Sequence, residues 1–171
     1  RPDIILFING IPIVVIECKS TTIKEPLKQA ISQHIRNQQE NGIRNLYVYS
    51  QILIATSLLE SKYATTNTKE EFWAVWKEKE ELYLENIEEL VNRTPDKSIT
   101  SLFFKNSDSR SPSNEKAFYD KYNEHVSVTE QDIILYGIAN PERLLSFIKD
   151  FVLFEGGLIK KVARFQQFFS I

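Results

Sequence analysis

The sequence has few of the residues that cross-link small domains or hold zinc. Its 171 residues include one cysteine and two histidines. A single cysteine excludes an internal disulfide and a cysteine-rich zinc site. His34 and His125 are far apart and form no short metal-binding motif. We therefore expect Cys18 to be a small buried hydrophobic residue and both histidines to lie on the surface.

Three further absences narrow the function. The longest apolar runs fall short of the roughly 18 residues that cross a bilayer, and no signal peptide is visible. These absences predict a cytoplasmic location and no membrane partner. No Gly-x-x-x-x-Gly-Lys-Ser/Thr phosphate loop is present. The net charge of −2 gives no overall basic field, so an enzyme acting on DNA would have to concentrate positive potential locally.

The length fits one domain, or one domain with an appendage, and the hydrophobic share of 42% is enough for a core. We expect a core over 1–92, a variable insertion or loop region over 93–139, with a polar loop at 105–115, and a helical segment over 140–171. Apolar residues stand near both ends of the sequence. This pattern predicts that the chain is a piece of a larger polypeptide.

The element pattern predicts an α/β fold with a central mixed sheet flanked by helices and a largely helical C-terminal portion. Asn9-Gly10 separates two apolar β-rich runs, which is a strong hairpin signal. Because both runs are almost wholly apolar, we expect helices to cover both faces of the sheet. The expected strands are 4–8, 11–18, 44–50, 51–56 and 63–66, and the expected helices are 25–39, 70–91 (capped by Thr68), 141–154 and 158–169.

The chemistry concentrates in Asp3, Glu17 and Lys19. An acid at the start of one strand and Glu-x-Lys at the end of the next form the PD-(D/E)xK nuclease pattern. Residues i and i+2 of a strand face the same way, so Glu17 and Lys19 share a face and Cys18 points to the other. An acid and a Glu-x-Lys also occur by chance near strands. Here, however, they lie on adjacent strands, and two charges end a strongly apolar run, which is costly without a purpose.

The hairpin register decides whether Asp3 and Glu17 meet. A two-residue turn would pair Asp3 with Ile16 and send the two carboxylates to opposite faces. A three-residue loop over 9–11, with Gly10 at a left-handed bulge position, pairs Asp3 with Glu17, and we predict this longer loop. Two adjacent carboxylates call for a cation, and oxygen ligands favour Mg²⁺ or Mn²⁺. Lys19 can orient the attacking water and offset charge on the phosphoryl oxygens.

Residues 1–19 closely resemble the catalytic hairpin of the restriction subunit of type I restriction-modification systems. Residues 30–33 and 46–56 resemble the helix and the strand pair that follow in that family, and residues 141–154 and 163–169 resemble the segment that leads into its motor domains. Residues 93–135 show no recognisable resemblance to that family. Gln33 matches a Gln-x-x-x-Tyr motif, but Asn37 stands where the tyrosine should be, which puts a DNA-positioning ring in doubt. The family also tends to have an acidic residue upstream of Arg1-Pro2-Asp3.

The resemblance implies an Mg²⁺-dependent endonuclease that cuts double-stranded DNA. It also implies that ATP binding and translocation belong to motor domains outside these residues. The methylation and specificity subunits would be its partners. Asp3 and Glu17 would hold the metal, and Asp3, Glu17, Lys19 and Gln33 would be catalytic. Gln33 is expected to point away from the apolar stripe of its helix, toward solvent or bound DNA.

Some assignments stay open between two interpretations. Lys24, Lys28 and Arg36 either contact DNA phosphates or form a solvated helix face. Trp73 and Trp76 fit core packing better than base stacking. Another PD-(D/E)xK nuclease, such as a repair or resolvase enzyme, and a non-catalytic docking module with a nuclease-like fold are the alternatives for the whole chain.

Overall fold

A computed structural model describes residues 1–78, 81–96, 98, 100, 116, 119–120, 125–157 and 159–170. The chain forms two compact units, one of residues 1–79 with 129–171 and one of residues 80–128. The predicted domain boundaries after residues 92 and 139 stay a prediction. The polar loop predicted at 105–115 lies outside the described residues.

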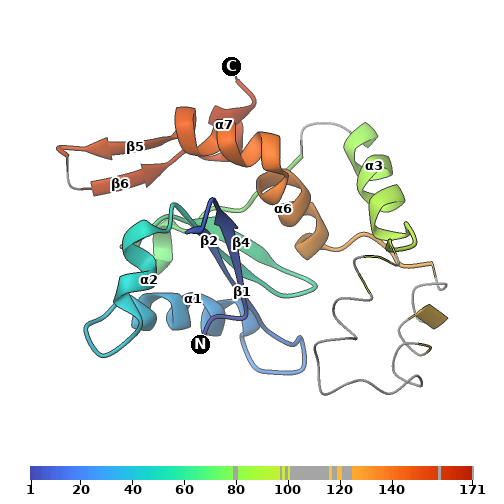
Figure 1. The fold of residues 1–171 in the computed structure, drawn as a ribbon, viewed down its shortest axis with the longest axis horizontal. Coiled ribbons are helices and arrows are strands. Elements are labelled where there is room, and N and C mark those ends of the chain that lie inside the picture. Colours follow the sequence, from blue (N-terminus) through green and yellow to red (C-terminus); the bar gives the residue numbers. More distant parts are fainter. Residues whose placement is uncertain are drawn as a thin grey trace. The chain divides into compact units, whose positions relative to one another are not determined.

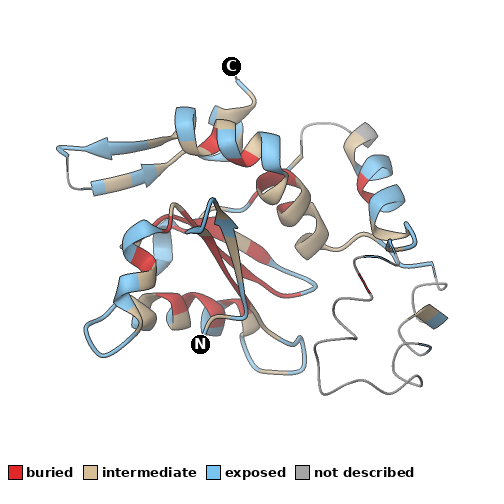
Figure 2. Cartoon of the chain, in the orientation of Figure 1, coloured by how far each residue is buried: buried red, intermediate tan, exposed pale blue. Residues whose placement is uncertain are grey.

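The first unit is built on a four-stranded mixed sheet, which confirms the predicted fold class. Its strands are β1 (Ile4–Ile8), β2 (Ile11–Cys18), β3 (Ile52–Thr56) and β4 (Ser61–Ala64), in the order β1-β2-β3-β4. β2 and β3 are parallel, and the two outer pairs are antiparallel. The central strands β2 and β3 supply the most deeply buried residues of the sheet (Figure 2).

Two helices make the connection between β2 and β3. They are α1 (Pro26–Asn37) and α2 (Arg44–Tyr49). α1 was predicted, but the strand predicted at 44–50 is wrong. Ile43, Leu46, Tyr47 and Ser50 follow the i, i+3, i+4, i+7 spacing of a helix, and these are the positions that turn inward. A parallel neighbour also requires a crossover connection, which a strand at this point could not provide.

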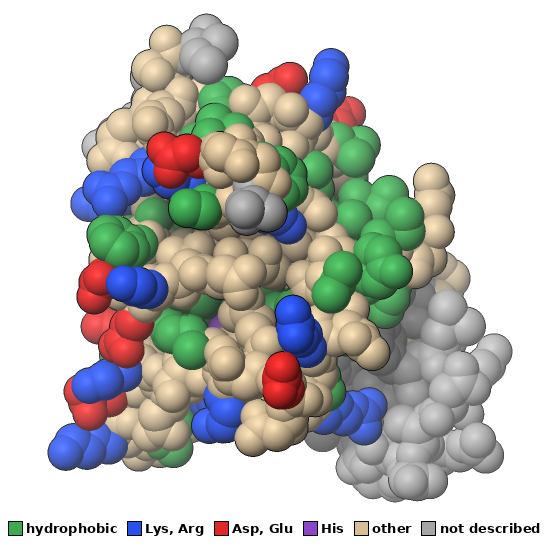
Figure 3. Space-filling view, turned by 90° about the vertical axis from the view of Figure 1, so that its left-hand side faces the viewer, with side chains coloured by type: hydrophobic (Ala, Val, Ile, Leu, Met, Phe, Trp, Pro, Cys, Tyr) green, Lys and Arg blue, Asp and Glu red, His purple; other side chains and the backbone are tan. Residues whose placement is uncertain are grey.

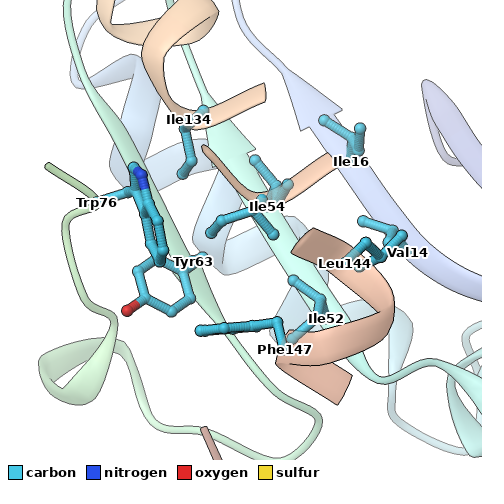
Figure 4. Close-up of a cluster of buried hydrophobic side chains, with 10 residues drawn as sticks. Val14, Ile16, Ile52, Ile54, Tyr63, Trp76, Ile134, Leu144 and Phe147 are labelled. Atoms are coloured by element: carbon cyan, nitrogen blue, oxygen red, sulfur yellow. The ribbon is translucent and has the colours of Figure 1, made fainter. Parts of the chain in front are cut away.

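Helices cover both faces of the sheet, as predicted. Val15, Leu53 and Ala55 face a core that α1 and α2 complete. Even-numbered residues of β2 and β3 face the opposite core, which α6 (Glu130–Ala139) and α7 (Pro141–Phe151) complete (Figures 1 and 4). Cys18 is half-buried and packs against this second core, pointing away from the neighbouring Glu17 and Lys19 face as predicted.

The helix predicted at 70–91 is wrong over its first half. Residues 70–72 form one 3-10 turn, η1 (Glu70–Phe72), without a side-chain cap from Thr68. The chain then runs extended, and Ala74 bridges Tyr63 beside β4. Trp73 enters the core under α1, whereas Trp76 enters the core under α6. Because the two rings serve cores on opposite faces of the sheet, an extended chain suits them better than a helix.

The C-terminal residues contain a hairpin that the sequence interpretation missed. α7 begins as predicted, with Pro141 in its first turn and the Asn140 side chain accepting from Glu142 and Arg143 amides. It ends at Phe151, and β5 (Val152–Glu155) pairs with β6 (Ile159–Val162). The predicted helix at 158–169 is therefore wrong, and only α8 (Phe165–Phe168) is helical. Gly156 and Gly157 adopt φ of 59° and 75° and form the hairpin turn.

The second unit contains α3 (Glu81–Val91), which buries Ile87. Asn92 exchanges hydrogen bonds with the backbone of Val126, accepting at 2.8 Å and donating at 3.0 Å. His125 lies on the surface, as predicted, 3.3 Å from Glu88. Among the helices that the structure describes, none combines the length and the apolarity needed to span a bilayer.

Candidate active site

The β1–β2 hairpin brings the predicted acids together by a route that the sequence interpretation did not foresee. Ile8 pairs with Ile11 across a two-residue turn, and Asn9 and Gly10 adopt φ of 49° and 81°. The predicted three-residue loop is therefore wrong. A β-bulge at Ile13 shifts the register instead, so that Phe7 pairs with Pro12 but Leu6 pairs with Val14.

The bulge restores the pairing that the chemistry requires. Beyond it, Ile4 pairs with Ile16, and the same register continued by one residue places Asp3 opposite Glu17. The amide of Cys18 donates to Asp3 Oδ2 at 2.8 Å. Lys19 Nζ lies 3.8 Å from Asp3 Oδ2 and 3.6 Å from Glu17 Oε2. Two carboxylates and one ammonium thus converge at the C-terminal end of β2.

The Cys18 amide is a contact that sequence reasoning missed. Every residue other than proline has such a donor, so no side-chain pattern marks the one that is used. Its effect is to fix an exposed acid. The side chain of Asp3 is 42% exposed, whereas that of Lys19 is 19% exposed and that of Glu17 is fully buried.

Glu17 is the electrostatic centre of the site. Burial, followed by the negative charge of Asp3, raises its pKa to about 7, against the opposing effects of Lys19 and Gln33. Gln33 Nε2 donates to Glu17 Oε2 at 2.6 Å. The other oxygen, Oε1, is buried and has no hydrogen-bond partner. A buried acceptor without a donor is costly, and a bound cation would relieve this cost.

The contact between Gln33 and Glu17 corrects the prediction that Gln33 points away from the sheet. The buried face of α1 consists of Leu27, Ala30, Ile31 and His34. At about 100° per residue, Gln33 lies roughly 110° from the centre of that face, on its flank. The prediction took Leu27, Ile31 and Ile35, which recur at four-residue intervals, as the apolar stripe and did not include His34.

His34 is buried, so the prediction of a surface histidine is wrong at this position. Its Nε2 lies 3.0 Å from the Ile54 carbonyl oxygen, and its Nδ1 lies 3.0 Å from Tyr47 Oη. Because a carbonyl can only accept, Nε2 carries the proton and Tyr47 donates to Nδ1. Burial lowers the pKa of His34 to about 4, so the ring is neutral at physiological pH.

This histidine fixes α1 relative to strands β2 and β3. Ile54, which accepts from His34, pairs with Ile16 on β2. Glu17, which accepts from Gln33, is the next residue of that strand. Consecutive residues of α1 are thus hydrogen-bonded to adjacent positions of β3 and β2.

A groove of about 310 Å³ runs along α1 beside Lys19. Lys28, Gln33 and Arg36, three of the four predicted DNA-binding residues, line it, together with Lys19, Glu25, Gln29 and Ser32. Lys24 is exposed but does not line the groove. Lys28 and Glu25 lie 3.8 Å apart and both are exposed, so this ion pair contributes little to stability.

Asp3 and Glu17 fit a hard divalent cation. Mg²⁺ keeps several of its waters and takes one or two carboxylates from the protein, and Glu17 Oε1 offers an oxygen without another partner. Within the described part of the chain, no group of three or more His, Cys, Asp or Glu side chains forms an alternative metal cluster. The donor set therefore suits Mg²⁺ or Mn²⁺ and does not suit a soft metal ion.

Comparison with known proteins shows what the chain resembles. Residues 1–72 match the family model described as "Type I restriction enzyme R protein N terminus". The whole chain is 29% identical over 171 residues to a "Putative type I restriction enzyme MjaIXP endonuclease subunit" of Methanocaldococcus jannaschii, and it spans 14% of that protein. The chain is also 29% identical over 175 residues to the "Type I restriction enzyme HindI endonuclease subunit" of Haemophilus influenzae. This alignment includes 99% of the chain and 13% of that protein. Residues 1–72 are therefore similar to the N-terminal region of type I restriction enzyme R proteins, and the chain as a whole is similar to part of two endonuclease subunits.

Proposed function

We propose that this chain is the nuclease domain of a type I restriction subunit and hydrolyses phosphodiester bonds of double-stranded DNA. The observation that carries the proposal is the convergence of Asp3, Glu17 and Lys19 at the end of β2, with one carboxylate oxygen of Glu17 left without a partner. The names of both relatives include the word endonuclease, which supports the same function.

Each side chain has a distinct role in this proposal. Asp3 and Glu17 would hold Mg²⁺ or Mn²⁺, which when bound polarises the phosphate and makes water a stronger nucleophile. Lys19 holds the attacking water and offsets negative charge that develops on the phosphoryl oxygens. Gln33 fixes the orientation of Glu17 through its 2.6 Å hydrogen bond to Oε2, which leaves Oε1 as the oxygen that would hold the cation. Water attacks directly, so no covalent enzyme intermediate forms.

DNA would lie along the groove beside α1. Lys28 and Arg36 line it and can contact phosphates, and Lys24 can contact the flanking backbone. Phosphate contacts position the duplex without reading bases, so this domain would cut with little sequence preference. Recognition, ATP hydrolysis and translocation are assigned to the rest of the protein and to the methylation and specificity subunits. With these assignments the proposal describes the whole enzyme and not this chain alone.

The test is plasmid cleavage by the full protein with its partner subunits, Mg²⁺ and ATP. Glu17→Gln should abolish cleavage and leave ATP hydrolysis intact, because the carboxylate serves the phosphate and not the motor. Gln33→Ala should slow cleavage by about 10–100-fold, since loss of a residue that orients a metal ligand has effects of this size. Glu60→Gln is the matched control, because Glu60 is an exposed glutamate outside the site.

Three results would contradict the proposal. Cleavage at the wild-type rate by Glu17→Gln would show that the site is elsewhere. Absence of cleavage by the wild-type complex under every cofactor condition would support a non-catalytic docking module. ATP-independent cutting would support another kind of PD-(D/E)xK nuclease.

A further inference from the structure

A second pocket lies where the end of α1, helix α2 and the β5–β6 hairpin meet. Its volume is about 320 Å³. Its lining is mainly polar, with Arg44 and Lys160 as the charged members: Gln38, Arg44, Tyr47, Val48, Gln51, Thr66, Asn67, Phe154 and Lys160. No carboxylate belongs to this lining, so the pocket has the charge of an anion site.

Lys160 is the residue whose setting calls for an anion. Its side chain is half-buried on β6, where Nζ donates to the Ser50 carbonyl oxygen at 2.9 Å and lies 5.6 Å from the centre of the Phe154 ring. Burial lowers its pKa. Neither Lys160 nor Arg44 forms an ion pair with a carboxylate of the described residues. A desolvated cation without a counter-charge is unfavourable, and a bound anion would compensate it.

Two amide side chains of the pocket, those of Gln38 and Gln51, are held by hydrogen bonds to the backbone. Gln38 donates to the His34 carbonyl oxygen at 3.0 Å and accepts from the Asn67 amide at 2.7 Å. Gln51 donates to the Tyr49 carbonyl oxygen at 2.9 Å. Figure 3 faces this side of the molecule, and there the acidic side chains of the described residues gather mainly along the left edge and the top. An anion in the pocket would therefore meet the half-buried ammonium of Lys160 and the exposed guanidinium of Arg44.

The position of the pocket fits a duplex that also reaches the catalytic site. Lys160 contacts Ser50 just before β3, whereas Glu17 pairs with Ala55, five residues further along. At about 3.3 Å per residue the separation along the strand is roughly 16 Å, or about five base steps of B-DNA. Helix α1 connects the two sites, because Gln33 contacts Glu17 and Gln38 lines the pocket.

We propose that Lys160 and Arg44 bind a backbone phosphate of the duplex, several base pairs from the bond that is cut. This inference rests on the proposed nuclease function, but it concerns a separate site on the opposite end of the sheet. In this proposal the β5–β6 hairpin helps to hold the DNA duplex through a phosphate contact. The contact is made to the backbone, so it adds affinity without sequence preference.

The experiment compares two neighbouring lysines. Lys160→Gln and Lys161→Gln each remove one positive charge from β6, but Lys161 lies outside the pocket and is paired with Glu155 at 2.6 Å. Both are introduced into the full Glu17→Gln protein, and the affinity for a labelled 30-base-pair duplex is measured by fluorescence anisotropy over a range of salt concentrations. Arg44→Gln is the second pocket variant, because loss of the Lys160 hydrogen bond to Ser50 could disturb the hairpin. Thermal unfolding checks that each variant folds.

Lys160→Gln and Arg44→Gln should each weaken duplex binding several-fold. Each should also make the fall of the logarithm of the binding constant with the logarithm of the salt concentration less steep, by about one in absolute slope, as expected for one lost phosphate contact. Lys161→Gln should leave the slope at the parent value. Equal slopes for Lys160→Gln, Arg44→Gln and Lys161→Gln would overturn the inference. It would also be overturned if the pocket bound inorganic phosphate but mutating it left the affinity for the duplex unchanged. Cutting of the duplex by the Glu17→Gln parent would instead contradict the proposed function.

Discussion

The two carboxylate oxygens of Glu17 have different surroundings although the whole side chain is buried. Oε2 receives the Gln33 amide and faces the Lys19 ammonium, whereas Oε1 has no donor. Replacing Gln33 would free Glu17 to rotate toward Lys19, which lies 3.6 Å away. The contribution of Gln33 is therefore one of orientation, and this is why its loss should slow cleavage without abolishing it.

His34 should make stability depend on pH in the acid range. Its folded-state pKa is about 4, below the ordinary value of 6.5, so the unfolded chain binds the proton more tightly. The stabilisation is complete above pH 6.5 and is lost as the pH falls toward 4. Between pH 7 and 5 this loss amounts to about 2 kcal/mol, at 1.36 kcal/mol per pH unit. Urea unfolding of wild type and His34→Gln at both pH values measures it.

The difference between the two proteins isolates the histidine, because all other titrating groups are common to both. We expect the free energy of unfolding of wild type to fall by about 2 kcal/mol more than that of His34→Gln. Equal losses in the two proteins would mean that His34 is not buried as the neutral ring.

The convergence of Asp3, Glu17 and Lys19 could be predicted from the sequence because strand alternation is strict. Glu17 and Lys19 had to share a face, and an acid on the adjacent strand had to lie near them. The contact between Gln33 and Glu17 could not be predicted, because it depends on His34 being buried. A histidine enters a core only when both ring nitrogens have partners, and those partners, Tyr47 and Ile54, come from other elements.

Strand β2 shows how one extra residue decides which side chains of a hairpin lie opposite each other. The Asn9-Gly10 dipeptide gives the two-residue turn that its sequence favours. Without a correction this turn would place Asp3 opposite Ile16. The bulge at Ile13 supplies the correction, and the carbonyl of the same residue accepts from the Gln51 amide at 2.8 Å. We predicted a longer loop because, in a hairpin without a bulge, only that loop brings Asp3 and Glu17 together, and the bulge that does so instead depends on the neighbouring strand.

Helix α6 depends on a glycine at its closest approach to the core. A Cβ on Gly137 would lie 1.9 Å from Trp76 Nε1. The ring cannot move freely, because Nε1 donates to Glu78 Oε1 at 2.8 Å and the ring packs against Phe147 at a centroid distance of 5.7 Å. Gly137→Ala should therefore destabilise the protein by about 1–3 kcal/mol. Helix propensity alone predicts the opposite sign, a gain of about 1 kcal/mol.

Chemical denaturation measures the free energy of unfolding for this substitution. Trp76→Phe supplies the control, because a smaller ring leaves room for the added methyl group. Gly137→Ala should cost less in that background than in wild type, and the non-additivity reports the clash directly. A stabilised Gly137→Ala protein would show that the helix and the ring are not in contact.

Secondary structure was predictable where the spacing of the apolar residues followed a single helix or strand period. The alternating and fully apolar strands and α1 are of this kind. α2 was misread because its aromatic and β-branched residues favour a strand, while the helical spacing of Ile43, Leu46 and Tyr47 covers little more than one turn. The β5–β6 hairpin was misread because paired glycines end a helix as readily as they form a turn.

At the level of the whole molecule, a net charge of −2 is compatible with DNA binding because the positive potential is local. The groove beside α1 carries Lys19, Lys28 and Arg36, and the pocket at the hairpin carries Arg44 and Lys160. Helices cover both faces of the central strands, and the two cationic sites lie at the ends of the sheet and along α1. The composition indicated that positive charge had to be concentrated, but only the fold shows where.

The same arrangement predicts that a divalent cation stabilises the first unit. Asp3 and Glu17 come together only when the hairpin and α1 are folded, so Mg²⁺ should bind the folded chain and not the unfolded one. With 10 mM Mg²⁺ and a dissociation constant of about 1 mM, the stabilisation is about 1.4 kcal/mol. For a chain of this size that corresponds to a rise in Tm of roughly 3–6 °C. Differential scanning fluorimetry with Mg²⁺ and then with excess chelator measures the shift and its reversal. Glu17→Gln should lose the shift, and Glu60→Gln, which alters an exposed glutamate outside the site, should keep it. An equal shift in wild type and Glu17→Gln would place the cation elsewhere on the protein, even if cleavage still required it.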